Sequence, residues 1–340
     1  MTDADGVAGP AGAPGVADPA TAPGPAPGLT RFTIEGRAAP ALFVVGWLAT
    51  VIGLGVLVIG FLAGGGTAGT VLFVVGASGT LLGLCALGGS QALERRAAGG
   101  WPYAGPSPVL VFIAMIPGTY LAVVVVGAPL EAIGAALPRP AVELLLVSLQ
   151  AAVTLALVRL LVVGTGALSW HEIGFRRGGG AAVADLAWGV VLAGPVILVT
   201  IVVAAILSAL VGQAPESPLP PTGTAESLVL HLVAGAAIAP LAEEVLFRGV
   251  AVTAWARLAG PSSAILRSSV LFALAHVLLE GGETFEAAAG LFVVGFVGRL
   301  PVAVALDWIY LRRGSIWSAI GLHGAFNAVL IAVAELGVGG

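Results

Sequence analysis

The chain is poor in charged residues, has one cysteine and contains no lysine, although it is 340 residues long. Charged residues make up 9% of it, whereas about 25% is usual in soluble domains. With 58% hydrophobic residues and a mean hydropathy of +1.06, a soluble protein could not cover its surface with polar groups. The single Cys85 excludes an internal disulfide and a cysteine metal cluster. These absences together predict a membrane protein.

Long apolar runs predict an all-α fold, a polytopic transmembrane helical bundle of about nine spans. Crossing hydrocarbon takes about 20 apolar residues, and several runs exceed this length. We expect a disordered cytoplasmic tail rich in Pro, Gly and Ala at 1–35, N-terminal transmembrane helices at 36–212 and a transmembrane core at 213–340. The predicted spans are 41–63, 69–90, 107–128, 141–164, 183–212, 227–249, 264–280, 287–310 and 314–336.

Arginines at the ends of alternate spans predict an orientation. Loops on the opposite side carry acids such as Glu216 and Glu280. By the positive-inside rule the arginine-bearing loops, and with them the N-terminus, are cytoplasmic. All 14 basic residues are arginine, which with abundant Ala and Gly suggests a GC-rich bacterial genome. We therefore expect a multi-pass protein of the bacterial inner (plasma) membrane. The arginines of this pattern are Arg31, Arg37, Arg95, Arg96, Arg176, Arg177, Arg248, Arg257, Arg267, Arg312 and Arg313.

Two adjacent acids interrupt the sixth span. Glu243 and Glu244 lie in an apolar run that ends at Arg248, and an ionisable group at the bilayer centre costs roughly 2.5–3.5 kcal/mol. Glu244 precedes Arg248 by four residues, the favoured order for an ion pair on a helix. Glu243 points about 100° away from its neighbour, which leaves it free for chemistry. Pro240 lacks an N–H group and should kink the span just before the acids.

Two histidines in other spans lie at a similar depth. At 1.5 Å per residue, Glu243 lies roughly 8 Å, His276 roughly 14 Å and His323 roughly 15 Å from the nearest cytoplasmic arginine. Asn327 follows His323 by four residues, so both side chains project from one helix face. We therefore expect these side chains to meet in one polar cavity in the cytoplasmic half of the membrane. His231, by contrast, is interpreted as interfacial or packing.

A carboxylate with two imidazoles suits hydrolysis of an amide bond, and two mechanisms fit the residues. In the first, the glutamate takes a proton from water, while imidazole and the Asn327 amide donate to the developing oxyanion. In the second, Glu243, His276 and His323 hold Zn²⁺, since two histidines and one glutamate form a known catalytic ligand set. We expect Asp307, in the eighth span, to be interfacial.

The motifs resemble those of the CAAX-protease and bacteriocin-processing (CPBP, or Abi) family of intramembrane endopeptidases. Three family motifs stand intact and in order within about 226–335. Each motif is common by itself, and the ordered set is specific. The motifs are Glu243-Glu244-Val-Leu-Phe-Arg248, Phe272-Ala-Leu-Ala-His276 and His323-Gly-Ala-Phe-Asn327.

The resemblance implies a helical membrane fold, with 213–340 as its catalytic core and a cavity open to the cytosol. It implies that Glu243, helped by His276, activates the hydrolytic water. It further implies that His323 and Asn327 stabilise the oxyanion, while Glu244 and Arg248 brace the site. The family has both a metal-dependent and a metal-free glutamate account, so Zn²⁺ and a metal-free mechanism are equally open.

Other functions fit the same composition. One alternative is a non-catalytic membrane scaffold or a bacteriocin self-immunity protein of the same fold. Another is a proton-coupled transporter, because intramembrane acids and histidines also form proton relays. Many transporters have a repeat of the span pattern between their two halves, and this sequence shows none, which argues against a transporter. The expected partners are the lipid bilayer and a peptide or protein substrate, with no nucleic acid.

Overall fold

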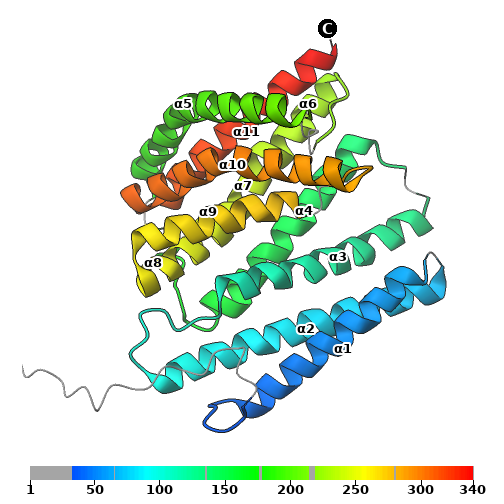
Figure 1. Cartoon of the computed structure of the whole chain (residues 1–340), viewed down its shortest axis with the longest axis vertical. Helices are drawn as coiled ribbons and strands as arrows, with labels where there is room; N and C mark the ends of the chain where they lie inside the picture. The colour runs from blue at the N-terminus through cyan, green and yellow to red at the C-terminus, as the bar shows by residue number, and fades with distance from the viewer. Residues whose placement is uncertain are drawn as a thin grey trace, which may run out of the picture.

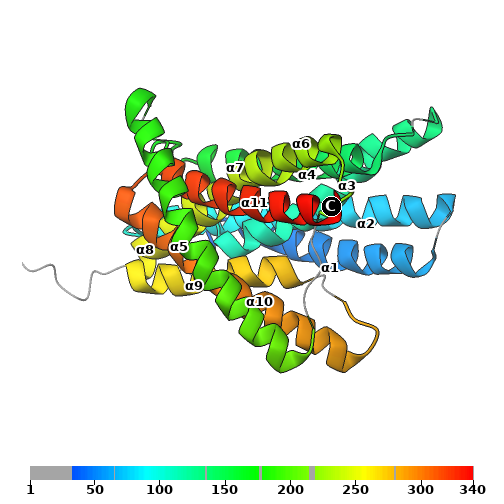
Figure 2. The same cartoon turned by 90° about the horizontal axis from the view of Figure 1, so that it is seen from above.

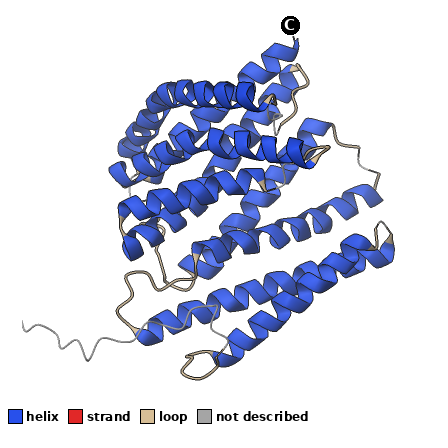
Figure 3. Cartoon of the chain, in the orientation of Figure 1, coloured by secondary structure: helices blue, strands red, loops and turns tan. Residues whose placement is uncertain are grey.

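The computed structural model describes residues 33–64, 66–134, 136–175, 178–213, 219–278 and 281–339. Every regular element among these residues is a helix, as Figure 3 shows, so the predicted all-α class is confirmed. The tail predicted at 1–35 falls almost entirely outside the described residues. Also outside them lie Arg31, Arg176, Arg177, Glu216 and Glu280, which were used to predict orientation.

Within the described residues, eight helical runs are long and apolar enough to cross a membrane, and the chain is a multi-pass membrane protein. The seventh predicted span is the exception: α9 has 17 residues, or roughly 25 Å at 1.5 Å per residue. The elements are α1 (Pro40–Leu62), α2 (Thr67–Ala98), α3 (Pro108–Ala132), α4 (Arg139–Val158), η2 (Arg159–Val163), α5 (Gly179–Val211), α6 (Ala225–His231), η3 (Leu232–Ile238), α7 (Ala239–Glu244), η4 (Val245–Val252), α8 (Thr253–Ala259), α9 (Pro261–Val277), α10 (Phe285–Arg313) and α11 (Ile316–Gly339).

The helices lie side by side, with the α1–α2 hairpin at one end of the array and α5 with α11 at the other (Figure 1). The first four helices pack in chain order, α1 on α2, α2 on α3 and α3 on α4. The α1–α2 contact is a seam of glycines: a Cβ at Gly53 would collide with the backbone of Thr80, and one at Gly76 with that of Leu57. Small residues allow membrane helices to approach closely, and here they hold the hairpin together.

The long helix α5 crosses α11 obliquely and also packs on α10 (Figure 2). Glycines mark the crossing point. A Cβ at Gly189 would collide with the carbonyl of Ser318, and one at Gly321 with the carbonyl of Leu186. Close backbone contact therefore fixes α11, which carries His323 and Asn327, against α5.

The loop between η2 and α5 folds back into the helix array. Ile173 is fully buried, and Gly249 leaves space for its side chain. The Tyr310 hydroxyl donates a hydrogen bond to the Ile173 carbonyl (3.0 Å), and the Ile316 N–H donates to the Gly174 carbonyl (3.2 Å). The loop thus joins η4, α10 and α11 at one end of the bundle.

An ion pair also ties this loop to α8. Arg257 Nη2 donates to Glu172 Oε1 at 2.8 Å, and the Ser169 N–H and hydroxyl both donate to Glu172 Oε2. The hydrogen bond from Arg257, followed by those from Ser169, lowers the pKa of Glu172 to about 2. Glu172 is therefore ionised at neutral pH and holds the loop against α8.

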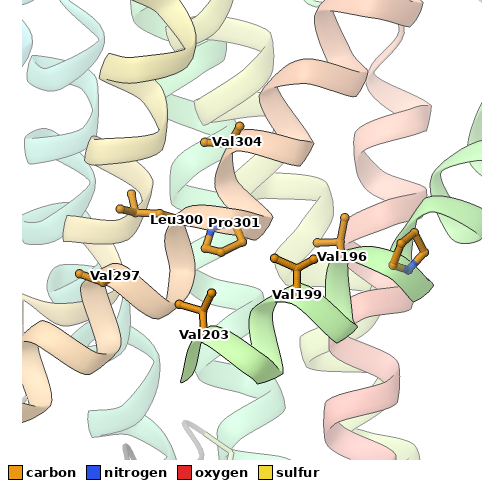
Figure 4. Close-up of a pocket in the computed structure, with 8 residues that line it drawn as sticks. Val196, Val199, Val203, Val297, Leu300, Pro301 and Val304 are labelled. Atoms are coloured by element: carbon orange, nitrogen blue, oxygen red, sulfur yellow. The ribbon is translucent and has the colours of Figure 1, made fainter. Parts of the chain in front are cut away.

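An open groove of about 550 Å³ lies between α5 and α10 (Figure 4). Its walls are apolar, and each helix has a proline in its interior beside the groove, Pro195 in α5 and Pro301 in α10. No titratable side chain lines it. The groove is therefore not the site predicted from the polar motifs. The other lining residues are Val196, Val199, Val203, Val297, Leu300 and Val304.

Candidate active site

The two adjacent acids lie at the end of α7, a short α-helical segment between two π-helical ones, η3 and η4. π-Helical turns inside longer helices are rare and often occur at functional sites. At the C-terminal end of η3 the Ala239 N–H bonds to the Ala234 carbonyl, five residues earlier. In that pattern the next donor would be residue 240 and its acceptor Gly235, but Pro240 has no N–H. Where a kink was predicted, the chain changes from π-helical to α-helical around Pro240, and in the π-helical pattern the freed carbonyl belongs to Gly235.

Asn327 supplies the missing donor. Its Nδ2 atom donates to the Gly235 carbonyl at 2.7 Å, across the contact between η3 and α11. Gly324, one turn earlier on α11, allows this approach, since a Cβ there would lie 2.6 Å from the Ala236 carbonyl oxygen. Asn327 therefore satisfies a backbone group that the proline leaves unpaired, and its amide has a second N–H for other partners.

Both predicted histidines converge on Glu243. The Oε2 atom of Glu243 lies 3.5 Å from His276 Nε2 and 3.9 Å from His323 Nε2. This oxygen is buried and has no hydrogen-bond partner among the described residues. A buried acceptor without a partner is costly, so its presence indicates a position for a water molecule or substrate group. These distances bring together the three side chains that the sequence led us to expect in one place.

The other ring nitrogen of each histidine has its own acceptor. His276 Nδ1 lies 2.8 Å from the Phe272 carbonyl oxygen, which can only accept, so Nδ1 carries a proton. His323 Nδ1 lies 2.7 Å from Glu244 Oε1 and donates to that carboxylate. In the neutral rings, both Nε2 atoms therefore face Glu243 without a proton. Such partners fix ring orientation and tautomer, as they do in many catalytic sites.

Access to the site is uneven. The side chains of Glu243 and His276 are 21% and 30% exposed, whereas that of His323 is only 5% exposed. Glu244 and Arg248 are fully buried. A molecule from outside would therefore meet Glu243 and His276 first, with His323 behind them.

A buried ion network supports His323. Arg248 Nη1 donates to Glu244 Oε1 at 3.0 Å, which confirms the ion pair predicted from their spacing. Arg248 Nε donates to Asp307 Oδ1 at 3.0 Å, and Nη2 donates to the Ala303 carbonyl at 3.2 Å. A chain of contacts therefore runs from α10 through η4 and α7 to the imidazole on α11.

The prediction that Asp307 is interfacial is wrong. Asp307 is fully buried and accepts hydrogen bonds from Ser268 (3.0 Å), Ser269 (2.9 Å) and Arg248. Its position in the eighth span, one turn before Arg312, resembled a span end. In the folded chain α10 continues past it to Arg313 and turns this face toward α9 and η4. The available signal was an acid within an apolar run, which usually has a buried partner.

Phe272 is buried and contacts the polar groups of the site. Its ring centroid lies 4.4 Å from that of His276 and 5.8 Å from that of His323. The Arg248 guanidinium carbon lies 4.5 Å from the same centroid, within the range of a cation–π interaction. One aromatic ring therefore packs against both imidazoles and the buried arginine.

The donor set fits a metal only incompletely. Glu243, His276 and His323 are the residues that would hold Zn²⁺, but within the described part of the chain no three His, Cys, Asp or Glu side chains are arranged as a metal site. The Nδ1 contacts would orient both rings equally well toward a water molecule.

Comparison with known proteins addresses this same part of the chain. Residues 225–329 match the family described as type II CAAX prenyl endopeptidase, Rce1-like. The matched segment is Rce1-like. The family resemblance predicted from the three motifs is confirmed, and the Rce1-like segment contains every residue of those motifs. No curated protein and no solved structure shows a significant match to the chain.

The Rce1-like segment resembles a family of CAAX prenyl endopeptidases, and it lies within a multi-pass membrane protein. A lipid bilayer is therefore the environment of the chain, and a peptide or protein is the class of substrate that the family acts on. The match begins at α6 and ends within α11, so α1 to α5 lie outside it.

Proposed function

We propose that the chain is an intramembrane endopeptidase of the bacterial inner membrane. It hydrolyses a peptide bond near the cytoplasmic face by means of a glutamate-activated water molecule. The observation that carries the proposal is the convergence of Glu243 Oε2 with His276 Nε2 at 3.5 Å and His323 Nε2 at 3.9 Å. The Rce1-like match of residues 225–329 supports the reaction class, and the arginine pattern supports the cytoplasmic side.

In the first step a water molecule donates hydrogen bonds to Glu243 and His276. Glu243 takes a proton as the water oxygen attacks the carbonyl carbon of the scissile bond. The buried Oε2 supports this role, because it is an acceptor without a hydrogen-bond partner among the described residues and lies beside two imidazoles. The product of the step is a tetrahedral intermediate with negative charge on the former carbonyl oxygen.

His323 and Asn327 stabilise that oxyanion. In this step we take His323 to carry one proton more than the neutral ring described above, gained from solvent before the attack. Its Nε2 then donates to the oxyanion, while Nδ1 donates to Glu244 at 2.7 Å and that carboxylate balances the imidazolium charge. Asn327 donates its second amide N–H. The intermediate then collapses, the C–N bond breaks, and the proton on Glu243 passes to the leaving amine. The water oxygen remains in the new carboxyl group, so the atoms of one peptide bond and one water are accounted for.

Replacing the proposed base tests the function. Glu243→Gln removes the proton acceptor, so kcat should fall about 10²–10⁴-fold, the usual contribution of a general base. The substrate is first found by comparing the membrane peptidomes of cells that carry wild-type protein or Glu243→Gln. Turnover of the peptide identified is then measured with purified protein.

The matched control is Glu226→Gln, which removes an exposed acid from the same span. It should leave turnover and the peptidome unchanged. His276→Ala is the second test variant and should also lower kcat. Full proteolysis by both Glu243→Gln and His276→Ala would reject the endopeptidase in favour of a non-catalytic scaffold.

Chelation separates the metal-free mechanism from its rival. We expect purified protein to retain its turnover after exhaustive dialysis against a strong Zn²⁺ chelator, with metal content measured on the same sample. Loss of turnover that Zn²⁺ restores would assign Glu243, His276 and His323 to a zinc site.

A further inference from the structure

A second buried polar cluster lies outside the motifs, where α4, α6 and α11 meet. His231, interpreted from the sequence as interfacial or packing, is fully buried, which agrees with the packing interpretation. Its Nε2 atom lies 2.6 Å from Glu143 Oε2 on α4, and its Nδ1 atom lies 2.7 Å from Glu335 Oε1 on α11. One imidazole ring therefore bridges carboxylates from two other helices.

The carboxylate on α11 is fully engaged. Besides His231, Glu335 accepts hydrogen bonds from the Ser227 hydroxyl (2.5 Å) and from the backbone N–H groups of Thr222 (3.1 Å) and Gly223 (2.9 Å). Four donors around one buried carboxylate stabilise its ionised form. Glu335 thus holds both the start of α6 and the segment that precedes it.

The number of protons in the cluster indicates that it holds the three helices together, and we call His231, Glu143 and Glu335 the clamp. A neutral imidazole has one N–H, but both ring nitrogens of His231 lie at hydrogen-bond distance from carboxylate oxygens. Two protons are therefore shared among His231, Glu143 and Glu335. Arg139 also donates to Glu143 Oε1 at 3.0 Å, so with His231 as imidazolium two positive charges face two negative ones. The charges balance within the cluster and bind the three helices together.

The clamp and the candidate active site lie on the same antiparallel pair of helices. His231 precedes Glu243 by twelve residues, and Glu335 follows His323 by twelve residues. A one-turn slip of α11 along its partner would break both contacts together. Polar contacts therefore mark the two ends and the middle of one helix interface. They are His231–Glu335, Gly235–Asn327 and Glu244–His323.

We propose that His231, held between Glu143 and Glu335, is a positioning residue for the endopeptidase. It sets the register of the span Ala225–Ala259 against α11 and thereby the separation of Glu243 from His323. The catalytic part of this statement rests on the proposed function. The structural part, that the clamp sets the helix register, is independent of it.

The kinetic test uses His231→Gln and Glu335→Gln, each of which leaves a buried carboxylate or imidazole without its partner. Because a misplacement of about 1 Å costs up to about 100-fold in rate, kcat should fall by about ten- to 100-fold with KM nearly unchanged. The double variant, with glutamine at both 231 and 335, restores a neutral hydrogen bond between the two side chains. Its fold-loss in kcat should be smaller than the product of the fold-losses of the two single variants. Glu226→Gln, on the same helix but exposed, should behave as wild type.

The structural test needs no substrate. Spin labels are placed on two exposed leucines close in sequence to the site residues, Leu241 on α7 and Leu330 on α11, in a Cys85→Ala background. The distance between the labels is measured by dipolar electron paramagnetic resonance in liposomes. His231→Gln should shift or broaden the distance distribution, and Glu226→Gln should not.

The outcomes separate the two proposals. An unchanged distance distribution in His231→Gln overturns the clamp, whatever happens to turnover. A changed distribution with full turnover overturns the positioning role. A changed distribution in a protein whose wild type cleaves nothing supports the clamp and rejects the endopeptidase. If His231→Gln does not fold, Glu143→Gln, at the partly exposed end of the clamp, replaces it in both measurements and is judged by the same outcomes.

Discussion

At the scale of single residues, buried charges inside the bundle have opposite charges as partners. Arg248 contacts the carboxylates of Glu244 and Asp307, and all three are fully buried. Desolvating such groups costs several kcal/mol each, and removal of one partner leaves an uncompensated charge. The network therefore does more to hold His323 in one orientation than to raise the stability of the fold.

Asp307→Asn tests that role. The variant leaves Arg248 with one carboxylate partner, so the free energy of unfolding should fall by about 3–5 kcal/mol. The kcat of the folded fraction should fall as well, because Glu244 would shift toward Arg248 and away from His323. Denaturant unfolding and turnover, normalised to folded protein, measure the two effects.

Asp185→Asn is the matched control. Asp185 is also buried and accepts two hydrogen bonds from Arg313, at 2.9 Å and 2.6 Å, but it lies on α5. This variant should destabilise the protein and leave the kcat of the folded fraction unchanged. Equal kcat values for both variants would show that Asp307 has no role beyond stability.

At the scale of elements, glycines and one proline decide how the helices meet. The α1–α2 seam depends on backbone contact at Gly53 and Gly76, where no Cβ fits. In the sixth span Pro240 has no N–H group to donate, so the Gly235 carbonyl of the π turn accepts a hydrogen bond from Asn327 instead. Local backbone chemistry thus determines which side chain crosses to the neighbouring helix.

A glycine substitution tests the seam. Gly76→Leu should push α2 away from α1 and lower the free energy of unfolding by about 1–3 kcal/mol or more, the cost of overpacking. Gly55→Leu is the control, because Gly55 lies on α1 with open space at its Cβ position. Thermal unfolding in detergent compares the two. Equal melting temperatures would mean that the seam is not held by glycine contact.

At the scale of the whole molecule, the chain has an orientation in the membrane that its arginines predict. The loop at Arg312 and Arg313 should face the cytoplasm, and the loop at Glu283 should face the other side. The Rce1-like helices would then present Glu243 and His276 in the cytoplasmic half.

Single cysteines test this orientation. In a Cys85→Ala background, Glu283→Cys should react with a membrane-impermeant maleimide on intact cells, and Arg312→Cys only after permeabilisation. Both positions are exposed, so the labelling difference reports the side of the membrane. The reverse labelling pattern would place the candidate active site near the outer face.

Much of the architecture was predictable because a membrane helix is encoded locally. Each predicted span corresponds to a helical run, and only α9 is shorter than a span. The i,i+4 pair of Glu244 and Arg248 was predictable for the same reason, since helix geometry alone brings the two together. The partners of Asp307 and His231 were not predictable, since they lie on other helices.

The sequence by itself determined the helices, their polar faces and the three motifs, because periodicity and hydropathy act within about 20 residues. Only the tertiary structure decided that Arg248 reaches Asp307, 59 residues away, and that His231 reaches Glu335, 104 residues away. Those pairings depend on how close two helices come and in which register they pack. Glycine contacts set how close the helices come. The π turns around Pro240 and the cost of leaving a buried charge unpaired set the register in which they pack. These effects act only in the assembled bundle.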